Sequence, residues 1–264
     1  MILDYIYHSG FAIEAEGVTV IIDYYKDSSE TENNRGIVHD YLLQRPGKLY
    51  VLATHFHPDH FNREILTWKE QRPDIQYIFS KDILKSHRAK SEDAFFIKKG
   101  EAYEDDTIRI DAFGSTDVGS SFLLHLQGWS IFHAGDLNNW HWSEESTEEE
   151  IRKANGDFLA EVKYLKEKAS NIDLVLFPVD RRMGKDYMKA VMHFVILLKM
   201  QVAVSSTSPI GAKVLRLPNK HIIIMNKFTI LFLTLLLALP VAMKAESAKE
   251  KRDDTRYLTG AVPE

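Results

Sequence analysis

The chain has 264 residues, 45% of them hydrophobic and 27% charged, so it can bury one large core without a disulfide staple. It contains no cysteine, which excludes disulfides, thiolate zinc sites and cysteine nucleophiles and leaves His, Asp and Glu as metal-binding side chains. The formal net charge of −5 argues against a nucleic-acid partner, because proteins that bind nucleic acids usually present a basic face.

The first three quarters of the chain consist of short strand-like segments interspersed with helical patterns, and the start carries no signal-peptide pattern. Helices are expected over residues 62–71, over 144–168 and from about 186, where apolar residues recur at helical spacing. Strands in this mixed order with helices predict a layered α/β fold rather than a doubly wound sheet. The expected strands are residues 1–7, 11–15, 18–23, 48–54, 75–79, 95–98, 108–113 and 172–177, with a hairpin formed by 121–126 and 129–133.

The pattern changes after about residue 195. The stretch up to residue 224 has no clear period, and the next segment has the layout of a secretory signal peptide, with Met225 and Lys227 before an apolar run and small residues near Ala245. The predicted units are a domain over residues 1–195, an aberrant connecting segment over 196–224, a signal-like or anchor-like segment over 225–245 and a polar tail over 246–264.

Three interpretations of the uncharged run from Phe228 to Met243 stay open. The run is shorter than the roughly 20 residues that a membrane-spanning helix prefers. It could be a C-terminal membrane anchor, a buried core helix, or the mark of a composite chain in which one gene runs out of frame into the start of a secreted protein. The anchor interpretation implies a membrane association. Otherwise a cytoplasmic location is expected, and the lack of cysteine is compatible with it.

Three histidines and an aspartate lie within six residues, at His55, His57, Asp59 and His60. The cluster directly follows an expected buried strand, so the loop at the carboxyl end of that strand can bring the side chains to one point. His55 and His57 alternate along the chain and can face one side, while Pro58 stiffens the turn that can aim Asp59 and His60 at a second ion. Neutral imidazole and carboxylate are ligands that zinc accepts, so the sequence predicts a metal site here.

This H-x-H-x-D-H signature resembles that of the metallo-β-lactamase superfamily, and the resemblance covers about residues 1–195. It implies an αββα sandwich, incomplete here at its C-terminal end, with two divalent metal ions between the sheet edges. His55 and His57 would serve one ion, and Asp59 and His60 the other. Zinc is the expected metal, with manganese or iron as alternatives.

The resemblance extends to other landmarks of the family. A strand ends in Gly-Asp at residues 132–136, which matches Asp136 to the carboxylate that bridges both metals in the family. Asp23, at the end of an apolar strand, matches the early structural aspartate. The segment Tyr7-His8-Ser9-Gly10-Phe11 resembles the opening of the branch that includes ascorbate-6-phosphate lactonases. Within this segment, His8 is expected either to contact a metal ligand without binding the metal itself, or to be a polar residue at a strand end.

The sequence departs from the family pattern in two places. The segment over residues 114–119 lacks the usual histidine, so Asp117, His133 or a water could take its place. The final histidine of the family follows the last helix and strand, but neither His193 nor His221 has that context. His141 lies on an aromatic-rich loop that could form a wall of the substrate pocket or simply pack Trp residues on the fold.

The predicted function is that of a metal-dependent hydrolase acting on a small molecule through an ester, lactone, amide or phosphodiester bond. Metal-activated water would be the nucleophile, and Asp59 or Asp136 would orient it or move its proton. The alternative is a catalytically impaired metal-binding relative, truncated or composite, which the run from Phe228 to Met243 could tether to a membrane. The oligomeric state is not predicted.

Overall fold

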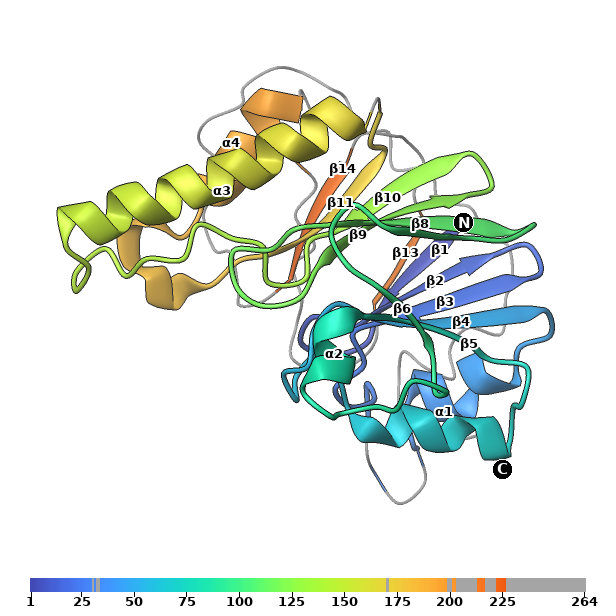
Figure 1. The fold of residues 1–264 in the computed structure, drawn as a ribbon. Coiled ribbons are helices and arrows are strands. Elements are labelled where there is room, and N and C mark those ends of the chain that lie inside the picture. The colour runs from blue at the N-terminus through green and yellow to red at the C-terminus, as the bar shows by residue number, and fades with distance from the viewer. Residues whose placement is uncertain are drawn as a thin grey trace.

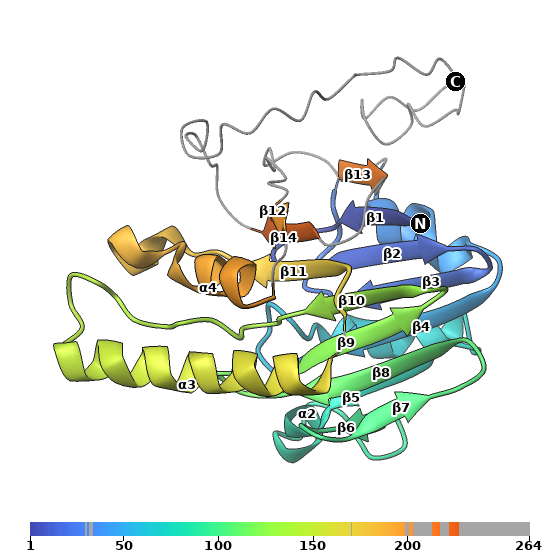
Figure 2. The ribbon, with the colours of Figure 1, turned by 90° about the horizontal axis from the view of Figure 1, so that it is seen from above.

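The computed structural model describes residues 1–29, 31, 34–169, 171–198, 201–202, 213–216 and 222–226. Two β-sheets face each other, and helices cover the outer face of each sheet (Figure 1 and Figure 2). This four-layered arrangement confirms the predicted αββα sandwich.

The first sheet carries its parallel strands side by side. Within the described residues it has seven strands in the order β13-β1-β2-β3-β4-β5-β6. Strands β3 to β6 run parallel, so their carboxyl ends meet at one edge of the sheet. The strands are β1 (Ile2–Tyr5), β2 (Phe11–Ala15), β3 (Val18–Ile22), β4 (Lys48–Ala53), β5 (Gln76–Ser80), β6 (Phe95–Ile97) and β13 (Lys213–Arg216).

The second sheet is antiparallel on one side and parallel on the other. Its order over the described part of the chain is β12-β14-β11-β10-β9-β8-β7. The predicted hairpin is confirmed as β9 and β10, and its turn at Gln127 and Gly128 has positive φ at both residues, as a two-residue hairpin requires. The strands are β7 (Ala102–Glu104), β8 (Ile108–Phe113), β9 (Ser121–Leu126), β10 (Trp129–His133), β11 (Leu174–Pro178), β12 (Gln201–Val202) and β14 (Ile222–Asn226).

Alternation along the strands divides the core into three apolar layers. In β2, Phe11 and Ile13 face the layer between the sheets, whereas Ala12 faces the helices on the first sheet. In β10, Ile131 points into the layer between the sheets, and Phe132 points to the helices on the second sheet. Strands buried on both faces read as continuous apolar runs, which is why the sequence shows them so clearly.

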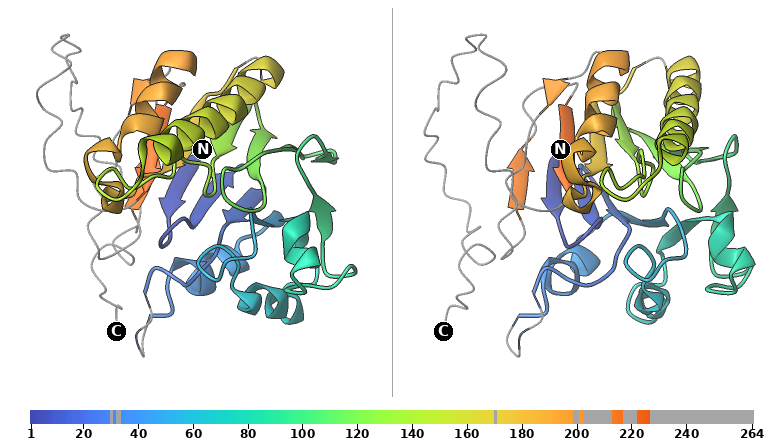
Figure 3. Two further views of the ribbon diagram at one scale, coloured as in Figure 1. Left: turned by 60° about the vertical axis from the view of Figure 1, so that its left-hand side comes forward. Right: turned by 90° about the vertical axis from the view of Figure 1, so that its left-hand side faces the viewer.

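Short helices cover the first sheet, and two longer helices cover the second (Figure 3). The segment expected as a helix over residues 62–71 is a 3-10 helix. The helix expected from residue 144 begins later, because Thr147 and Glu150 form a capping box at its start. The helices are α1 (Ile37–Asp40), η1 (Leu42–Gln44), η2 (Arg63–Glu70), α2 (Lys81–Lys85), α3 (Glu148–Lys168), η3 (Arg181–Asp186) and α4 (Lys189–Leu198).

Sheet pairing continues beyond residue 195, where the sequence predicts that the domain ends. Strand β13 pairs with β1, and β14 lies between β11 and β12. Met225, expected at the start of the signal-like segment, belongs to β14, whose apolar run is typical of a strand with neighbours on both sides. The run from Phe228 to Met243 and the polar tail lie outside the described residues. Within the described part, no helix has the length and apolar character needed to cross a membrane.

Candidate metal centre

The candidate metal centre lies where strands of both sheets end. Asp23 follows β3, and Thr54 and His55 follow the neighbouring parallel strand β4. Asp136 lies three residues after the end of β10 in the other sheet. The topology therefore brings together side chains that are far apart in the sequence.

Asp23 organises the interior of this centre. Its side chain is fully buried, and its carboxylate accepts hydrogen bonds from the backbone N–H and the hydroxyl of Thr54, both at 2.7 Å. It also accepts from His60 Nδ1 and His133 Nε2, both at 2.8 Å. Burial alone would raise the pKa of Asp23, but the charges and hydrogen bonds of His133 and His60 hold that pKa well below its usual range.

These hydrogen bonds decide which ring nitrogens are available as ligands. The Asp23 carboxylate can only accept, so Nδ1 of His60 carries a hydrogen and Nε2 is left to face the site. The Thr54 hydroxyl uses its one hydrogen on Asp23, so it accepts from His55 Nδ1 at 3.1 Å. His55 therefore also presents a bare Nε2 to the site.

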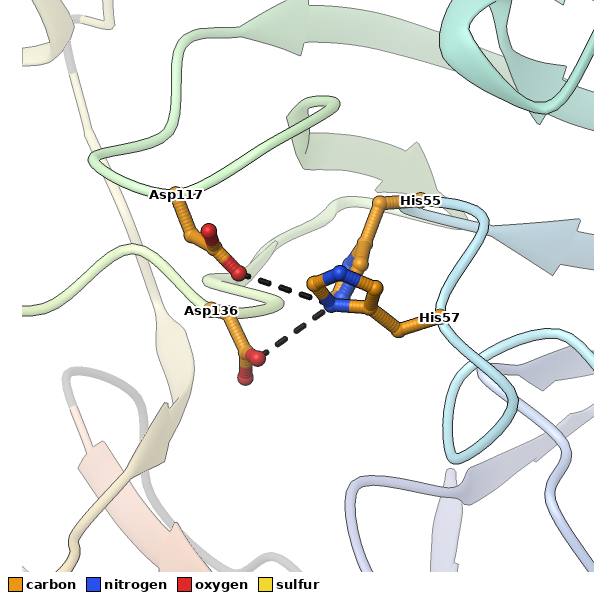
Figure 4. A group of neighbouring side chains, drawn as sticks. All are labelled: His55, His57, Asp117 and Asp136. Atoms are coloured by element: carbon orange, nitrogen blue, oxygen red, sulfur yellow. Dashed lines mark ion pairs between the residues drawn. The ribbon is translucent and has the colours of Figure 1, made fainter. Parts of the chain in front are cut away.

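The first ligand group contains His55, His57, Asp117 and Asp136 (Figure 4). One ligand atom from each lies within 4.8 Å of the others. His55 Nε2 lies 3.6 Å from Asp136 Oδ2, and His57 Nδ1 lies 3.5 Å from Asp117 Oδ2. His55 is fully buried, whereas His57 and Asp117 are each more than a third exposed, so the group opens to solvent on one side.

Backbone contacts place Asp117 in this group. The N–H of Ser120 donates to the carbonyl oxygen of Thr54 at 2.9 Å, which ties the Asp117 loop to the end of β4. Gly119 allows this approach, because its φ is 77° and a Cβ there would lie 2.3 Å from the same oxygen. Across the site, the N–H of Phe56 donates to Asp82 Oδ2 at 2.9 Å and holds the histidine loop.

The second ligand group contains His8, Asp59 and His60, again with one ligand atom each within 4.8 Å. Asp136 links the two groups, since its Oδ1 lies 3.2 Å from His60 Nε2 while its Oδ2 faces His55. A carboxylate with one oxygen toward each group is suited to bridge two ions, as the resemblance implies.

The residues present fit a pair of divalent ions. The buried Nε2 atoms of His55 and His60 have no hydrogen-bond partner of ordinary geometry, which is costly unless something else binds them. The four inter-residue distances of the site lie between 3.2 and 3.6 Å. Ligands about 2.0–2.1 Å from a tetrahedral zinc stand roughly 3.4 Å apart.

The pKa values indicate how the ligands are charged before a metal binds. Burial and the neighbouring charge of His60 lower the pKa of His55 to about 4, so His55 is neutral at pH 7. Burial would lower the pKa of His60, but Asp23 and Asp136 raise it to about 10. Burial would raise the pKa of Asp136, but His60 lowers it to about 2. A metal would therefore displace a proton that lies between His60 and Asp136.

A family model described as "Beta-lactamase superfamily domain" matches residues 2–154, more than half of the chain. The chain belongs to the metallo-β-lactamase superfamily. No curated protein matches it. The family assignment confirms the predicted superfamily, whereas the ascorbate-6-phosphate lactonase branch stays a prediction.

Two solved structures show how widely the superfamily fold is shared. CmlA, a diiron beta-hydroxylase from Streptomyces venezuelae, is 15% identical with a TM-score of 0.51, over 77% of this chain and 44% of that chain. Igni18, a metallo hydrolase from the archaeon Ignicoccus hospitalis, is 19% identical with a TM-score of 0.50, over 80% of this chain and 86% of that chain. This chain thus spans less than half the length of CmlA, and at such identities the likeness shows the fold alone.

Besides Asp23, two predicted site residues lie outside the ligand groups. His133 Nε2 donates to Asp23, so its ring supports that buried carboxylate and belongs to neither ligand group. His141 is buried and contacts Asp186 Oδ2 at 2.9 Å and the Asn139 carbonyl oxygen at 3.0 Å. His141 is thus packed in the interior and does not line the cavity beside the centre, which agrees with packing, one of the two roles that the sequence left open for its loop.

Two further residues lie beside the centre. Trp140 belongs to the aromatic-rich loop that the sequence offered either as a pocket wall or as a packing element, whereas Arg182 was not singled out from the sequence. A cavity of about 60 Å³ is lined by His8, Asp59 and Asp136 and also by Trp140 and Arg182. Trp140 donates from Nε1 to the carbonyl oxygen of Asp136 at 2.7 Å. Arg182 lies just after β11, so the rule that site residues follow strand ends could have found it.

Proposed function

We propose that this chain is a metal-dependent hydrolase that acts on a small polar substrate. The observation that carries the proposal is the pair of ligand groups that share Asp136, with the buried Nε2 atoms of His55 and His60 both beside the Asp136 carboxylate. His55, His57, Asp117 and Asp136 would hold one ion, and Asp59, His60 and Asp136 the other.

The metal pair, when bound, would supply hydroxide near neutral pH by lowering the pKa of water. The chain's own residues would orient this chemistry. Asp59 is about two-fifths exposed and lies beside the cavity, so it is suited to accept a proton from the attacking water. Asp136 is held more rigidly, since its backbone oxygen is bonded to Trp140 and its carboxylate faces two histidines.

The cavity favours a small substrate with a polar reacting group. Trp140 offers an apolar wall, and Arg182 offers a cation near the acidic residues, although Asp180 already accepts hydrogen bonds from Arg182. An ester, lactone, amide or phosphodiester bond suits such a lining.

Zinc is the proposed metal, because every candidate ligand is an imidazole or a carboxylate, both of which zinc accepts. The same nitrogen and oxygen donors also suit iron, and the fold likeness to a diiron beta-hydroxylase keeps an oxidative reaction as the second candidate. Metal analysis decides between them.

The test combines metal analysis of the purified full chain with hydrolase assays on lactones, phosphodiesters and thioesters. We expect zinc to co-purify and at least one class to be hydrolysed, with the Asp59→Asn and Asp136→Asn variants reduced about 100-fold or more. Asp74→Asn, which changes an exposed aspartate paired with Arg72, serves as the control. Zinc binding without turnover of any class would favour the impaired relative, and iron with oxygen consumption would favour the second candidate.

A further inference from the structure

His8 lies on the turn that joins β1 to β2, beside the second ligand group. We infer that His8 is itself a metal ligand and completes that group with Asp59 and His60. The inference rests on the proposed function, because it assigns a further ligand to the same centre. From the sequence, His8 was expected either to support the ligands without binding the metal or to be a polar residue at a strand end.

The distances place His8 among the ligand atoms. Its Nε2 lies 3.2 Å from Asp59 Oδ2, close to the roughly 3.4 Å that separates two ligands of a tetrahedral zinc. The third member, His60, is fully buried, and its Nε2 has no hydrogen-bond partner of ordinary geometry. The group therefore includes a buried histidine whose ligand atom lies within 4.8 Å of those of His8 and Asp59.

The turn is built to hold the His8 ring in this place. The N–H of Ile6 donates to the carbonyl oxygen of Gly10 at 3.0 Å, and that of Gly10 donates to Tyr7 at 2.8 Å. The φ of His8 is 55°, a left-handed conformation that residues other than glycine seldom adopt. Strained backbone of this kind is concentrated at functional sites, where the surrounding structure maintains it.

Neighbouring side chains orient the imidazole so that Nε2 faces the site. His8 Nδ1 lies 3.2 Å from the hydroxyl of Ser9, which is buried. The ring also makes edge contacts with His60 and Tyr25, at centroid distances of 5.7 and 6.1 Å. A fixed ring with its second nitrogen bonded elsewhere is the arrangement found for histidines that bind metals.

The consequence concerns the terminal ligand that the superfamily places after the last strand. His193 is on α4 and packs against Phe158, and it belongs to neither ligand group. With His8, the second ion would have His8, Asp59, His60 and Asp136 as protein ligands. All four precede residue 195, so this site would be complete without the C-terminal part of the chain.

Zinc titration of the metal-free full chain tests the inference, with His8→Gly as the variant. Glycine accepts the left-handed backbone, so the change removes the imidazole without new strain. We expect two zinc ions for the parent. For His8→Gly we expect one, with affinity for the other reduced by more than the roughly 10–100-fold typical of losing an outer-shell partner. Free imidazole should restore much of that affinity, since it can refill the vacated position.

His87→Gly is the matched control, because His87 also has a left-handed backbone, with φ of 54°, and lies in neither ligand group. It should bind two ions as the parent does. Unchanged binding of both ions by His8→Gly would overturn the inference and leave the proposed function standing. A second outcome would also overturn it: zinc binding that is weakened and not restored by imidazole, together with a lower melting temperature of the metal-free variant. That result would indicate a structural role for His8. A parent that binds no zinc would overturn the proposed function itself.

Discussion

Asp23 is the residue on which the geometry of the metal centre depends. Its carboxylate accepts from the end of β4, from a ligand histidine and from β10 in the other sheet. Four hydrogen bonds to one buried carboxylate stabilise its charged form and align His60 at the same time. A side chain that belongs to neither ligand group thus sets the orientation of a histidine that belongs to one of them.

The Asp23→Asn variant should lose both stability and metal affinity. An amide NH2 would face N–H and O–H donors in a buried position, so we expect the free energy of unfolding to fall by about 3 kcal/mol. Zinc affinity should fall about 10–100-fold, because His60 loses the partner that fixes its tautomer. Urea denaturation and zinc titration would measure the two effects. If Asp23→Asn were as stable as the parent, the hydrogen bonds to the Asp23 carboxylate would not be needed for the fold.

A second charged cluster lies away from the metal centre, among the helices that cover the first sheet. His39, in α1, contacts Asp27 through Nδ1 and Glu64 through Nε2, each at 2.7 Å. The hydrogen bond to Asp27 is the largest of the effects that raise the pKa of His39 above its ordinary value of 6.5. Its contribution to stability is therefore complete below pH 6.5 and is lost as the pH rises through the raised pKa.

We expect His39→Gln to be destabilising by about 1–2 kcal/mol near pH 6, since hydrogen bonds to a charged partner are lost. The difference from the parent should shrink above the raised pKa, where His39 in the parent becomes neutral. Urea unfolding at several pH values between 5.5 and 9 would follow this change. His87→Gln, which changes an exposed histidine outside this cluster, is the control. A His39→Gln effect that grows with pH would contradict the assigned sign.

At the scale of elements, the site depends on loops that approach each other closely. The loop that carries Asp117 lies against the end of β4, with the backbone of Gly119 beside Thr54. Gly128, in the β9–β10 turn, has nearly the same φ, 78° against 77°, but a Cβ there would meet nothing within 4 Å. A comparison of substitutions at Gly119 and Gly128 therefore separates the cost of the left-handed backbone from the cost of the close approach to Thr54.

Replacing each glycine by alanine measures these two effects. Gly128→Ala should cost about 1 kcal/mol, for the left-handed conformation alone. Gly119→Ala carries the same strain and also pushes Thr54 and His55 apart from the loop, so we expect it to cost a further ~2 kcal/mol. It should also weaken zinc binding, because Asp117 moves, whereas Gly128→Ala should not. Equal effects of the two variants on stability and zinc affinity would show that the close approach does not matter.

At the scale of the whole molecule, the candidate ligands join the two sheets. His55, His57, Asp59 and His60 follow a strand of the first sheet, whereas Asp117 and Asp136 belong to loops of the second. Bound metal would thus cross-link the halves of the sandwich. Binding that is specific to the folded state stabilises by about 2.7 kcal/mol when the free ligand is at 100 times its Kd.

Removal of metal should therefore lower the melting temperature of the full chain. We expect a chelator to shift it down by several degrees and added zinc to restore it, as followed by differential scanning calorimetry. Asp136→Asn should show a much smaller chelator effect, because it loses the carboxylate that links both groups. A parent whose melting temperature is the same with chelator and with zinc would contradict binding at this centre.

The sequence by itself determined the superfamily, the layered fold and the core of the metal motif. These features are local: strands buried on both faces read as apolar runs, and His55 to His60 lie within six residues at the end of one such strand. The ends of the helices were harder to predict from the sequence, although the capping box at Thr147 and Glu150 marked the start of α3. The sheet partners of β13 and β14 could not be recognised locally, because pairing depends on which strand edges are left open.

Only the tertiary structure decided how the other candidates are used. The family resemblance made Asp117, His133 and His8 possible neighbours of the metals. In the structure, Asp117 lies in a ligand group, His133 contacts Asp23, and His8 lies beside Asp59. The difference depends on side-chain directions set by contacts across 50 to 110 positions of the chain, such as that between Asp23 and His133. Hydrogen bonds at 2.8 Å between residues so far apart form only after the two sheets have packed, so no local pattern in the sequence encodes them.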